Sequence, residues 1–316
     1  MSSVDDKRLV QEIDGERYSI FFDPKKIREA LQFKPRSGDI ILFTYPASGT
    51  HWMTQMIQLI IHEGRSARNQ EDFYSRSHFL EHLGKKVDKV RTYPRLLYTH
   101  IRPGKIPITL QAKYVYVARA PWDVCPSLYE TGRGVPGRPT LASFEEYVSM
   151  FLEGNVGMGS HFQHIHAGYT RKHQTNFFFV TYEEMSRDLK GVLLRLADFL
   201  RPDYASVLRD DPELLSKVAD QCSAEFMRRL PAISEERLVD LVFQNPDLKC
   251  EAPAAASDVE KSRMKFVREA KPGRWVRAFS KDQLRLLLEK INKLPEAKCV
   301  QDIWQDEFLK VRDAAQ

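Results

Sequence analysis

The sequence predicts an α/β fold, a single domain with a central parallel sheet flanked by helices. The chain has 316 residues, which is enough for one large domain with a full core. Short continuous apolar runs recur along it, as in strands that are buried on both faces. Segments with apolar residues at helical spacing lie between these runs, and such alternation predicts parallel strands joined by covering helices. We expect residues 1–316 to form this one domain.

The first expected elements are a helix, a strand and a second helix. Asp23-Pro24 offers an N-cap acceptor and a residue with helical φ, which predicts a helix near residues 24–32. The apolar run at 40–44 predicts a buried strand. A tight turn at 45–49 then leads into apolar residues at helical spacing, which continue to Gly64. The order strand, tight loop and helix N-terminus suits the binding of a phosphate group.

Three later apolar runs predict the remaining strands, and two segments predict further helices. The runs are Arg95–His100, Tyr114–Arg119 and Phe177–Thr181. Leucine and valine at helical spacing predict a helix over 189–200. Ser280 and Gln283 have the spacing of a capping box and predict a helix through 284–291. The stretch 251–262 interrupts this pattern, and we expect a mobile loop there rather than a domain boundary.

Composition limits the classes of ligand and compartment. The formal charge is +5 and the isoelectric point is near 8.9, with Lys and Arg spread along the chain, which favours a small anionic ligand over nucleic acid. No window is apolar enough to span a bilayer, and the first residues lack the apolar core of a signal peptide. We therefore expect a cytoplasmic protein with no membrane partner. The cysteines lie far apart, which suits reduced thiols: Cys125, Cys222, Cys250 and Cys299.

Polar residues follow each expected strand, where open parallel sheets bind their ligands. They are Ser48-Gly49-Thr50, Thr99-His100, Arg119 with Ser127, and Tyr182. Backbone N–H groups, hydroxyls and a guanidinium suit a phosphate-bearing ligand. His100 is open to two interpretations, a general base beside the anion or a structural histidine. The histidines at 161, 164, 166 and 173 do not have the spacing of a metal site, so we expect no metal.

Residues 44–52, Thr-Tyr-Pro-Ala-Ser-Gly-Thr-His-Trp, resemble the phosphosulfate loop of cytosolic sulfotransferases, which typically reads T-Y-P-K-S-G-T-T-W. The resemblance continues through Pro94–His100, through Tyr116–Arg119 with Ser127, and through Tyr182–Met185. It ends in Phe266-Val267-Arg268 with Gly273 and Trp275, similar to the family's F-x-R-K-G-x-x-G-D-W segment. It covers roughly residues 30–290 in the family's order, which strengthens signals that are each weak alone.

The resemblance implies a sulfotransferase domain that uses PAPS, 3′-phosphoadenosine 5′-phosphosulfate, as sulfonate donor. Ser48, Gly49 and Thr50 would hold the phosphosulfate and Trp52 would stack on the adenine. Arg119, Ser127 and Arg268 would bind the 3′-phosphate, and Tyr182 would face the nucleotide. The same nucleotide site would include Ala47, His51, Cys222, Glu269 and Ala270. His100 would be the general base, and Phe79 and His82 would wall the pocket of a small-molecule acceptor.

Several positions depart from the family pattern. Ala47 stands where the family has a lysine that neutralises the leaving phosphate, and Tyr98 replaces a second lysine. His51, on the first turn of the following helix, is the candidate for an additional catalytic N–H donor. Glu269 and Ala270 replace Lys-Gly. Cys222 lies in a Cys-Ser-Ala segment that replaces a Thr-Ser-Phe-like adenine contact.

Two functions therefore remain open. One is transfer of a sulfonate group from PAPS to the hydroxyl or amine of a phenol, monoamine or alcohol, at a rate reduced by Ala47. The other is a catalytically impaired protein of the same fold that binds a nucleotide or small molecule. The C-terminal segment matches the family's dimer motif poorly, so monomer and dimer both remain possible.

Overall fold

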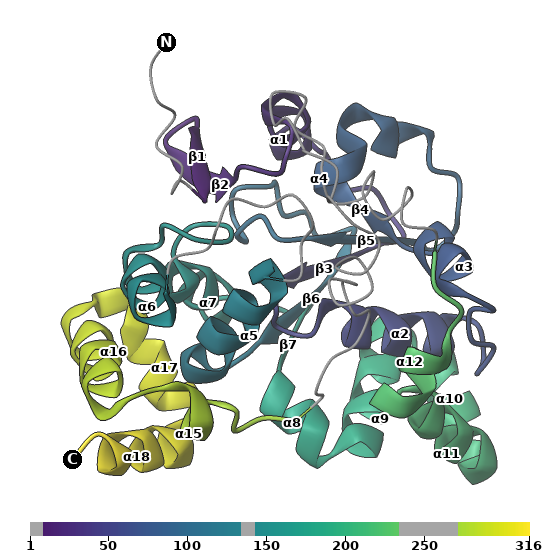
Figure 1. The fold of residues 1–316 in the computed structure, drawn as a ribbon. Coiled ribbons are helices and arrows are strands. Elements are labelled where there is room, and N and C mark those ends of the chain that lie inside the picture. The colour runs from purple at the N-terminus through teal and green to yellow at the C-terminus, as the bar shows by residue number, and fades with distance from the viewer. Residues whose placement is uncertain (1–8, 134–142, 234–270) are drawn as a thin grey trace.

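A five-stranded parallel sheet forms the centre of the protein. The computed structural model describes residues 9–133, 143–233 and 271–316 (Figure 1). The strand order is β4-β5-β3-β6-β7, and every neighbouring pair in it is parallel. The strands are β3 (Asp39–Thr44), β4 (His78–Phe79), β5 (Arg95–Thr99), β6 (Lys113–Ala118) and β7 (Phe177–Thr181). The expected α/β fold with a parallel sheet is confirmed.

Helices cover both faces of this sheet. One face carries α2 (Thr50–Ile61), α9 (Leu189–Leu200), α10 (Pro202–Asp210) and α11 (Pro212–Gln221), with α8 (Tyr182–Arg187) and α12 (Ala224–Arg229) near them. The other carries α1 (Pro24–Leu31), α5 (Pro121–Arg133), α6 (Phe144–Glu153), α7 (His161–Tyr169), α15 (Trp275–Ala278), α16 (Lys281–Lys293), α17 (Lys298–Ile303) and α18 (Gln305–Ala314). Strand β3 shows the division, since Ile41 and Phe43 pack into one core and Ile40 and Leu42 into the other.

The expected elements form close to their expected bounds. Asp23 caps α1 by accepting from the Lys25 N–H at 2.8 Å, and Ser280 and Gln283 form the expected capping box of α16. The strands expected at 95–100 and 114–119 end one residue earlier, so His100 and Arg119 lie just beyond the sheet. The loop expected at 251–262 lies outside the described residues.

The sequence did not reveal several short elements. A hairpin of β1 (Val10–Ile13) and β2 (Glu16–Ser19) lies outside the sheet, near α1 and the end of α6 (Figure 1). Strand β4 has two residues and pairs with β5. Short helices follow one another before β5: α3 (Gln70–Ser75), α4 (Leu80–Leu83) and the 3₁₀ helix η1 (Gly84–Lys89), and a second 3₁₀ helix, η2 (Pro295–Ala297), follows α16. Elements this short contain too few residues for a hydrophobic period to be read.

A buried ion pair closes the amino end of the sheet. The Arg95 guanidinium donates to both carboxylate oxygens of Asp39, at 2.8 and 2.7 Å, and to the Val87 carbonyl at 2.9 Å. Both side chains are less than 5% exposed. This bidentate contact joins the first residues of β3 and β5 at the edge opposite the expected site.

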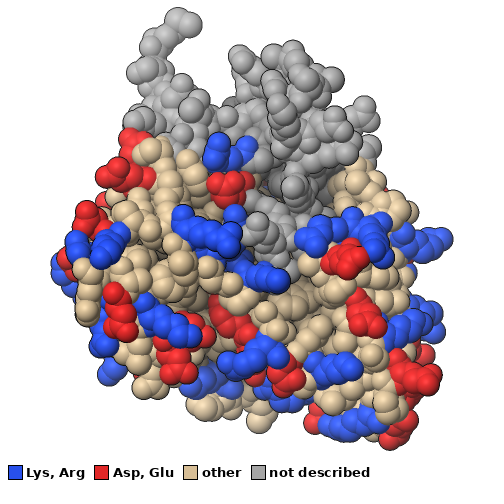
Figure 2. Space-filling model, turned by 60° about the horizontal axis from the view of Figure 1, so that its bottom comes forward, with Lys and Arg blue, Asp and Glu red and all other residues tan. Residues whose placement is uncertain are grey.

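Charge on the surface is mixed in sign. Figure 2 shows Lys and Arg side chains spread over one face of the molecule with Asp and Glu among them. Within the described ranges, no helix is long and apolar enough to cross a membrane.

Candidate active site

The turn between β3 and α2 has the form of an anion-binding loop. Ala47 and Gly49 adopt left-handed backbone conformations, with φ of 64° and 102°. A Cβ atom on Gly49 would lie 2.9 Å from the Tyr182 ring, so only glycine lets the two approach. The Ser48 hydroxyl is buried and has no hydrogen-bond partner in the described part of the chain. The α2 N-terminus follows directly, and its first backbone N–H groups lack carbonyl partners within the helix.

Arg119 lies beside this loop, directly after β6. Its Nη1 donates to the Ala47 carbonyl at 2.8 Å and reaches the Ser127 hydroxyl at 3.5 Å. The guanidinium stands 4.2 Å from the centre of the Tyr182 ring. The side chain is only 4% exposed, yet Nε and Nη2 have no partner among the described residues. Because buried guanidinium N–H groups without hydrogen-bond partners are costly, this arrangement is suited to an anionic ligand.

An aromatic pair adjoins the guanidinium. The Trp52 and Tyr182 rings meet edge to face with 5.1 Å between their centroids. The indole Nε1 of Trp52 is buried without a hydrogen-bond partner in the described ranges. The structure thus brings loop residues, Arg119, Ser127, Trp52 and Tyr182 to one place, as the sequence predicted.

His100 is joined to the same loop by hydrogen bonds. Its Nδ1 lies 2.8 Å from the Thr44 carbonyl and 3.2 Å from the Thr44 hydroxyl, which is 2.7 Å from the Thr50 hydroxyl. A carbonyl oxygen only accepts, so Nδ1 carries the hydrogen and Nε2 keeps a lone pair. Burial lowers the pKa of His100 to about 4. The imidazole is therefore neutral at physiological pH, with Nε2 available to accept a proton.

A cluster of aromatic side chains adjoins His100 through Phe79. Phe79 contacts it edge to face at 5.1 Å and stacks on Tyr98 at 4.8 Å. His82 lies 4.4 Å from the Phe79 ring, and Phe22 contacts both rings. The two residues expected to wall an acceptor pocket thus lie beside the expected base. Sequence reasoning missed Phe22, which precedes α1 and belongs to no motif.

Other expected site residues lie elsewhere or outside the described ranges. The His51 ring packs on Phe73 and Tyr74, and its Nε2 is 3.4 Å from the Tyr74 hydroxyl. Cys222 is 1% exposed, in the core beside α11, and is a free thiol. Arg268, Glu269 and Ala270 lie outside the described residues.

The chain after residue 270 returns beside α5. The buried Asp123 carboxylate accepts from the Gly273 N–H at 2.8 Å and from the Trp275 N–H at 3.3 Å. Asp123 follows Arg119 by four residues in the sequence. This contact fixes the start of the C-terminal segment close to the carboxyl edge of the sheet.

Among the described residues, no group of three or more His, Cys, Asp or Glu side chains has the geometry of a metal site. His161 and His164 are both buried, and His164 binds Tyr116 and the His100 carbonyl.

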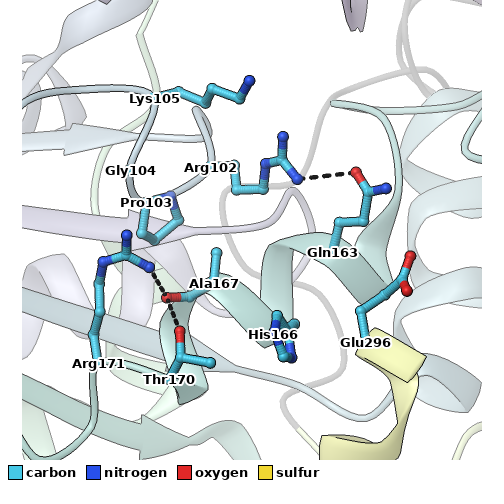
Figure 3. A pocket seen from close by; sticks show the side chains of 10 residues that line it. All are labelled: Arg102, Pro103, Gly104, Lys105, Gln163, His166, Ala167, Thr170, Arg171 and Glu296. Carbon is cyan, nitrogen blue, oxygen red and sulfur yellow. Dashed lines mark hydrogen bonds between the residues drawn. The ribbon is translucent and has the colours of Figure 1, made fainter. Parts of the chain in front are cut away.

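A second cavity of about 450 Å³ lies between the loop after His100 and α7 (Figure 3). Its lining comprises Arg102, Pro103, Gly104, Lys105, Gln163, His166, Ala167, Thr170, Arg171 and Glu296. The cations there already have partners. Arg102 donates to Gln163 at 2.9 Å and to Glu16 at 2.7 Å, Lys105 pairs with Glu16, and Arg171 donates to the Ala167 carbonyl at 2.6 Å. This cavity offers weaker anion recognition than the Arg119 site.

Buried titratable groups set the pH dependence of stability. Burial lowers the pKa of His100 to about 4 and of His161 to about 3, and lowers that of His164 well below 6.5. Burial raises the pKa of Glu81 to about 8 and of Glu183 to about 7. Below pH 6.5 the unfolded chain binds protons at these histidines that the folded protein excludes, so stability falls as pH falls. From about pH 4.5 to the folded pKa values of about 7 and 8, the folded protein retains two carboxyl protons that the unfolded chain has released. These carboxyl groups make stability fall as pH rises; below pH 6.5 the three histidines outweigh them, and above pH 6.5 the carboxyl groups dominate.

We expect the melting temperature to be highest near pH 6.5 and to fall on both sides. Each proton that only one of the two states binds changes the free energy of unfolding by about 1.4 kcal/mol per pH unit, between the folded and unfolded pKa values of its group. Thermal melts from pH 5 to 9 measure this directly, and Glu81→Gln should flatten the alkaline side. A melting temperature that stays constant between pH 6.5 and 8 in the parent protein would contradict the expectation.

The parallel sheet, the loop between β3 and α2, the buried arginine and the strand-end histidine together have the geometry of an anion site at the carboxyl edge of an α/β domain. Residues 37–298 match the family model described as sulfotransferase domain. The chain belongs to the sulfotransferase family, whose activity is sulfonate transfer.

Curated relatives and solved structures agree with this assignment. Amine sulfotransferase of Oryctolagus cuniculus is 32% identical over 214 residues, which cover 66% of this chain and 69% of the relative. Sulfotransferase 1E1 of Homo sapiens is 28% identical over a stretch that covers 67% of this chain and 73% of the relative. The crystal structure of mouse sulfotransferase SULT7A1 complexed with PAP superposes with a TM-score of 0.70 at 21% identity, covering 93% of this chain and 99% of that one. The crystal structure of retinol dehydratase in complex with androsterone and PAP superposes with a TM-score of 0.64 at 19% identity, covering 89% of this chain and 87% of that one. These structural matches show the fold.

Proposed function

We propose that this protein transfers a sulfonate group from PAPS to the hydroxyl or amine of a small molecule, with His100 as general base. The acceptor would be a phenol, a monoamine or an alcohol. The observation that carries the proposal is the hydrogen-bonded link from His100 through Thr44 to Thr50. It joins the base to the first residue of the anion-binding helix.

The unpartnered groups of the site fit the nucleotide. Arg119 Nε and Nη2 would bind a phosphate in charge-assisted hydrogen bonds, with Ser127 beside them. Trp52 and Tyr182 offer aromatic faces to a base. The Ser48 hydroxyl and the N–H groups at the start of α2 would hold the phosphosulfate. PAP in the solved structures of SULT7A1 and retinol dehydratase supports the same class of ligand for this fold.

The chemistry follows from the proton positions. His100 Nε2 takes the proton of the acceptor hydroxyl while the hydroxyl oxygen forms a new bond to sulfur. The bond between sulfur and the bridging phosphate oxygen breaks, and its electron pair stays on that oxygen. The loop N–H groups and the α2 dipole stabilise the developing negative charge. The products are a sulfate ester and PAP, and the imidazolium returns its proton to solvent.

The acceptor class can be tested with labelled donor. Purified protein, PAPS labelled in the sulfonate group and a panel of phenols, monoamines, alcohols and sugars would show which molecules become labelled. Transfer to at least one phenol, monoamine or alcohol supports the proposal. Nucleotide binding without transfer to any acceptor would instead support the second function, a binding protein of the same fold. Ala47 and Tyr98 favour that alternative, because both stand where the family has lysine.

Arg119→Ala should weaken PAP binding by more than tenfold. A charge-assisted hydrogen bond to phosphate contributes about 1.5–3 kcal/mol, and Arg119 has two nitrogens available for such bonds. Titration calorimetry with PAP measures the change. Arg102→Ala is the matched control, because the Arg102 guanidinium is paired with Glu16 at the second cavity. The PAP affinity of this variant should stay within twofold of the parent. Equal affinities in Arg119→Ala and the parent would exclude the phosphate site.

A further inference from the structure

Two side chains form hydrogen bonds with the backbone of His100. Strand β5 ends at Thr99, so the His100 N–H and carbonyl lie beyond the last strand residue. The N–H donates to Glu81 Oε1 at 2.6 Å, and the carbonyl accepts from His164 Nε2 at 3.2 Å. Side chains here satisfy backbone groups just past the end of the strand. Neither Glu81 nor His164 belongs to the proposed nucleotide or acceptor sites.

Glu81 collects three donors on one oxygen. Besides the His100 N–H, Oε1 accepts from the Thr99 hydroxyl at 3.0 Å and from the Ile101 N–H at 3.1 Å. The side chain is fully buried, forms no ion pair among the described residues, and leaves Oε2 without a partner there. Burial of a carboxyl group costs free energy. The three hydrogen bonds that this carboxyl accepts all come from consecutive residues centred on His100.

His164 contacts the His100 carbonyl from α7. Because the His100 carbonyl only accepts, His164 Nε2 carries the hydrogen and Nδ1 is an acceptor. The Tyr116 hydroxyl lies 2.7 Å from this Nδ1 and 2.8 Å from the His164 carbonyl, which holds the ring in place. Burial keeps the pKa of His164 well below 6.5, so the neutral form persists through the physiological range.

The third contact holds the imidazole itself. Nδ1 of His100 donates to the Thr44 carbonyl on the neighbouring strand β3. Three attachments from three elements therefore fix the direction of Nε2. A displacement of about 1 Å between reacting groups can cost on the order of a hundredfold in rate.

We propose that Glu81 and His164 are positioning residues that hold the His100 backbone so that Nε2 faces the acceptor. This inference rests on the proposed role of His100 as general base. Glu81→Ala removes all three hydrogen bonds at once, whereas Glu81→Gln keeps an acceptor oxygen of the same shape. His164→Phe keeps the volume of the ring but removes the donor to the His100 carbonyl.

Steady-state kinetics and histidine NMR together test the proposal. Glu81→Ala should lower kcat by roughly tenfold to a hundredfold with KM for PAPS within threefold of the parent, and Glu81→Gln should recover most of that loss. His164→Phe should lower kcat by roughly tenfold. The His100 resonance, assigned by its absence in His100→Ala, should titrate closer to 6.5 in Glu81→Ala, because a loosened ring is better hydrated.

Asp39→Asn is the matched control. Asp39 is a buried carboxyl on the neighbouring strand at the opposite edge of the sheet, where it binds Arg95. Its substitution should lower stability yet leave kcat and the His100 titration unchanged. If Glu81→Ala does not fold, the comparison rests on Glu81→Gln and His164→Phe.

Unchanged kcat and unchanged His100 titration in the folded variants would overturn the positioning role. The NMR readout also separates this inference from the proposed function. If the parent protein transfers no sulfonate but the His100 titration still moves in Glu81→Ala or His164→Phe, the positioning stands and the general-base role falls.

Discussion

His100→Ala should abolish most turnover while leaving the nucleotide site intact. Loss of a general base typically lowers the rate by about a hundredfold to ten-thousandfold. The neutral imidazole with Nδ1 bound to Thr44 presents Nε2 as the acceptor, and alanine removes that acceptor without touching Arg119 or the loop amides. Initial rates with saturating PAPS and the best acceptor of the panel measure the effect. PAP affinity, measured by calorimetry, should stay within threefold of the parent.

A histidine outside the site is the control for that change. His166 lies on α7, exposed, at the second cavity, and His166→Ala should leave kcat unchanged. A His100→Ala variant that turns over within threefold of the parent would remove His100 from the mechanism. Loss of PAP binding together with activity would show instead that the substitution damages the loop.

Ala47→Lys should raise the turnover number by at least tenfold. Removal of one donor that stabilises a developing oxyanion usually costs about a hundredfold to a thousandfold, so a restored donor should recover part of such a loss. The lysine would stabilise the charge that develops in the transition state, so PAP affinity should change little. Ala47 is partly exposed and already has a left-handed φ of 64°, so an unbranched lysine adds no new backbone strain.

Ala47→Met separates charge from size at this position. Methionine adds a long side chain without a donor, so it should not accelerate transfer. Equal rates for the lysine and methionine variants would show that positive charge at position 47 does not limit this protein. A lysine variant that binds PAP but, like its parent, labels no acceptor would favour the binding-protein function.

The residues at the strand ends were predictable because their signal is local. An apolar run that stops at a polar or charged side chain predicts both a buried strand and the edge where a ligand binds. His100 and Arg119 were found in this way, and both side chains contact the turn that follows β3. The order of the strands was not predictable, since β3 lies between β5 and β6 through pairings that no local pattern records.

Glu81 and His164 were not predictable as partners of His100. Glu81 lies in a helix of four residues, too short to show which of its sides is buried. His164 was noted only as one of several histidines near one another in the sequence, where the question was metal binding. Each of them contacts His100 from another element, at a distance along the sequence of 19 residues for Glu81 and 64 for His164. Only the assembled sheet shows which buried polar groups meet.

The anion-binding site also has consequences for biosynthesis. Its guanidinium, Arg119, joins the Ala47 carbonyl, Ser127 and the Tyr182 ring, which the ribosome produces in that order over 136 residues. At a synthesis rate of about 5–20 residues per second, Tyr182 is produced roughly 7 to 27 seconds after Ala47. During that interval the nascent chain has no complete nucleotide site, so cellular nucleotide can stabilise only the late folding intermediates. Pairings this distant in sequence also slow folding, which makes the incomplete sheet the stage most exposed to aggregation.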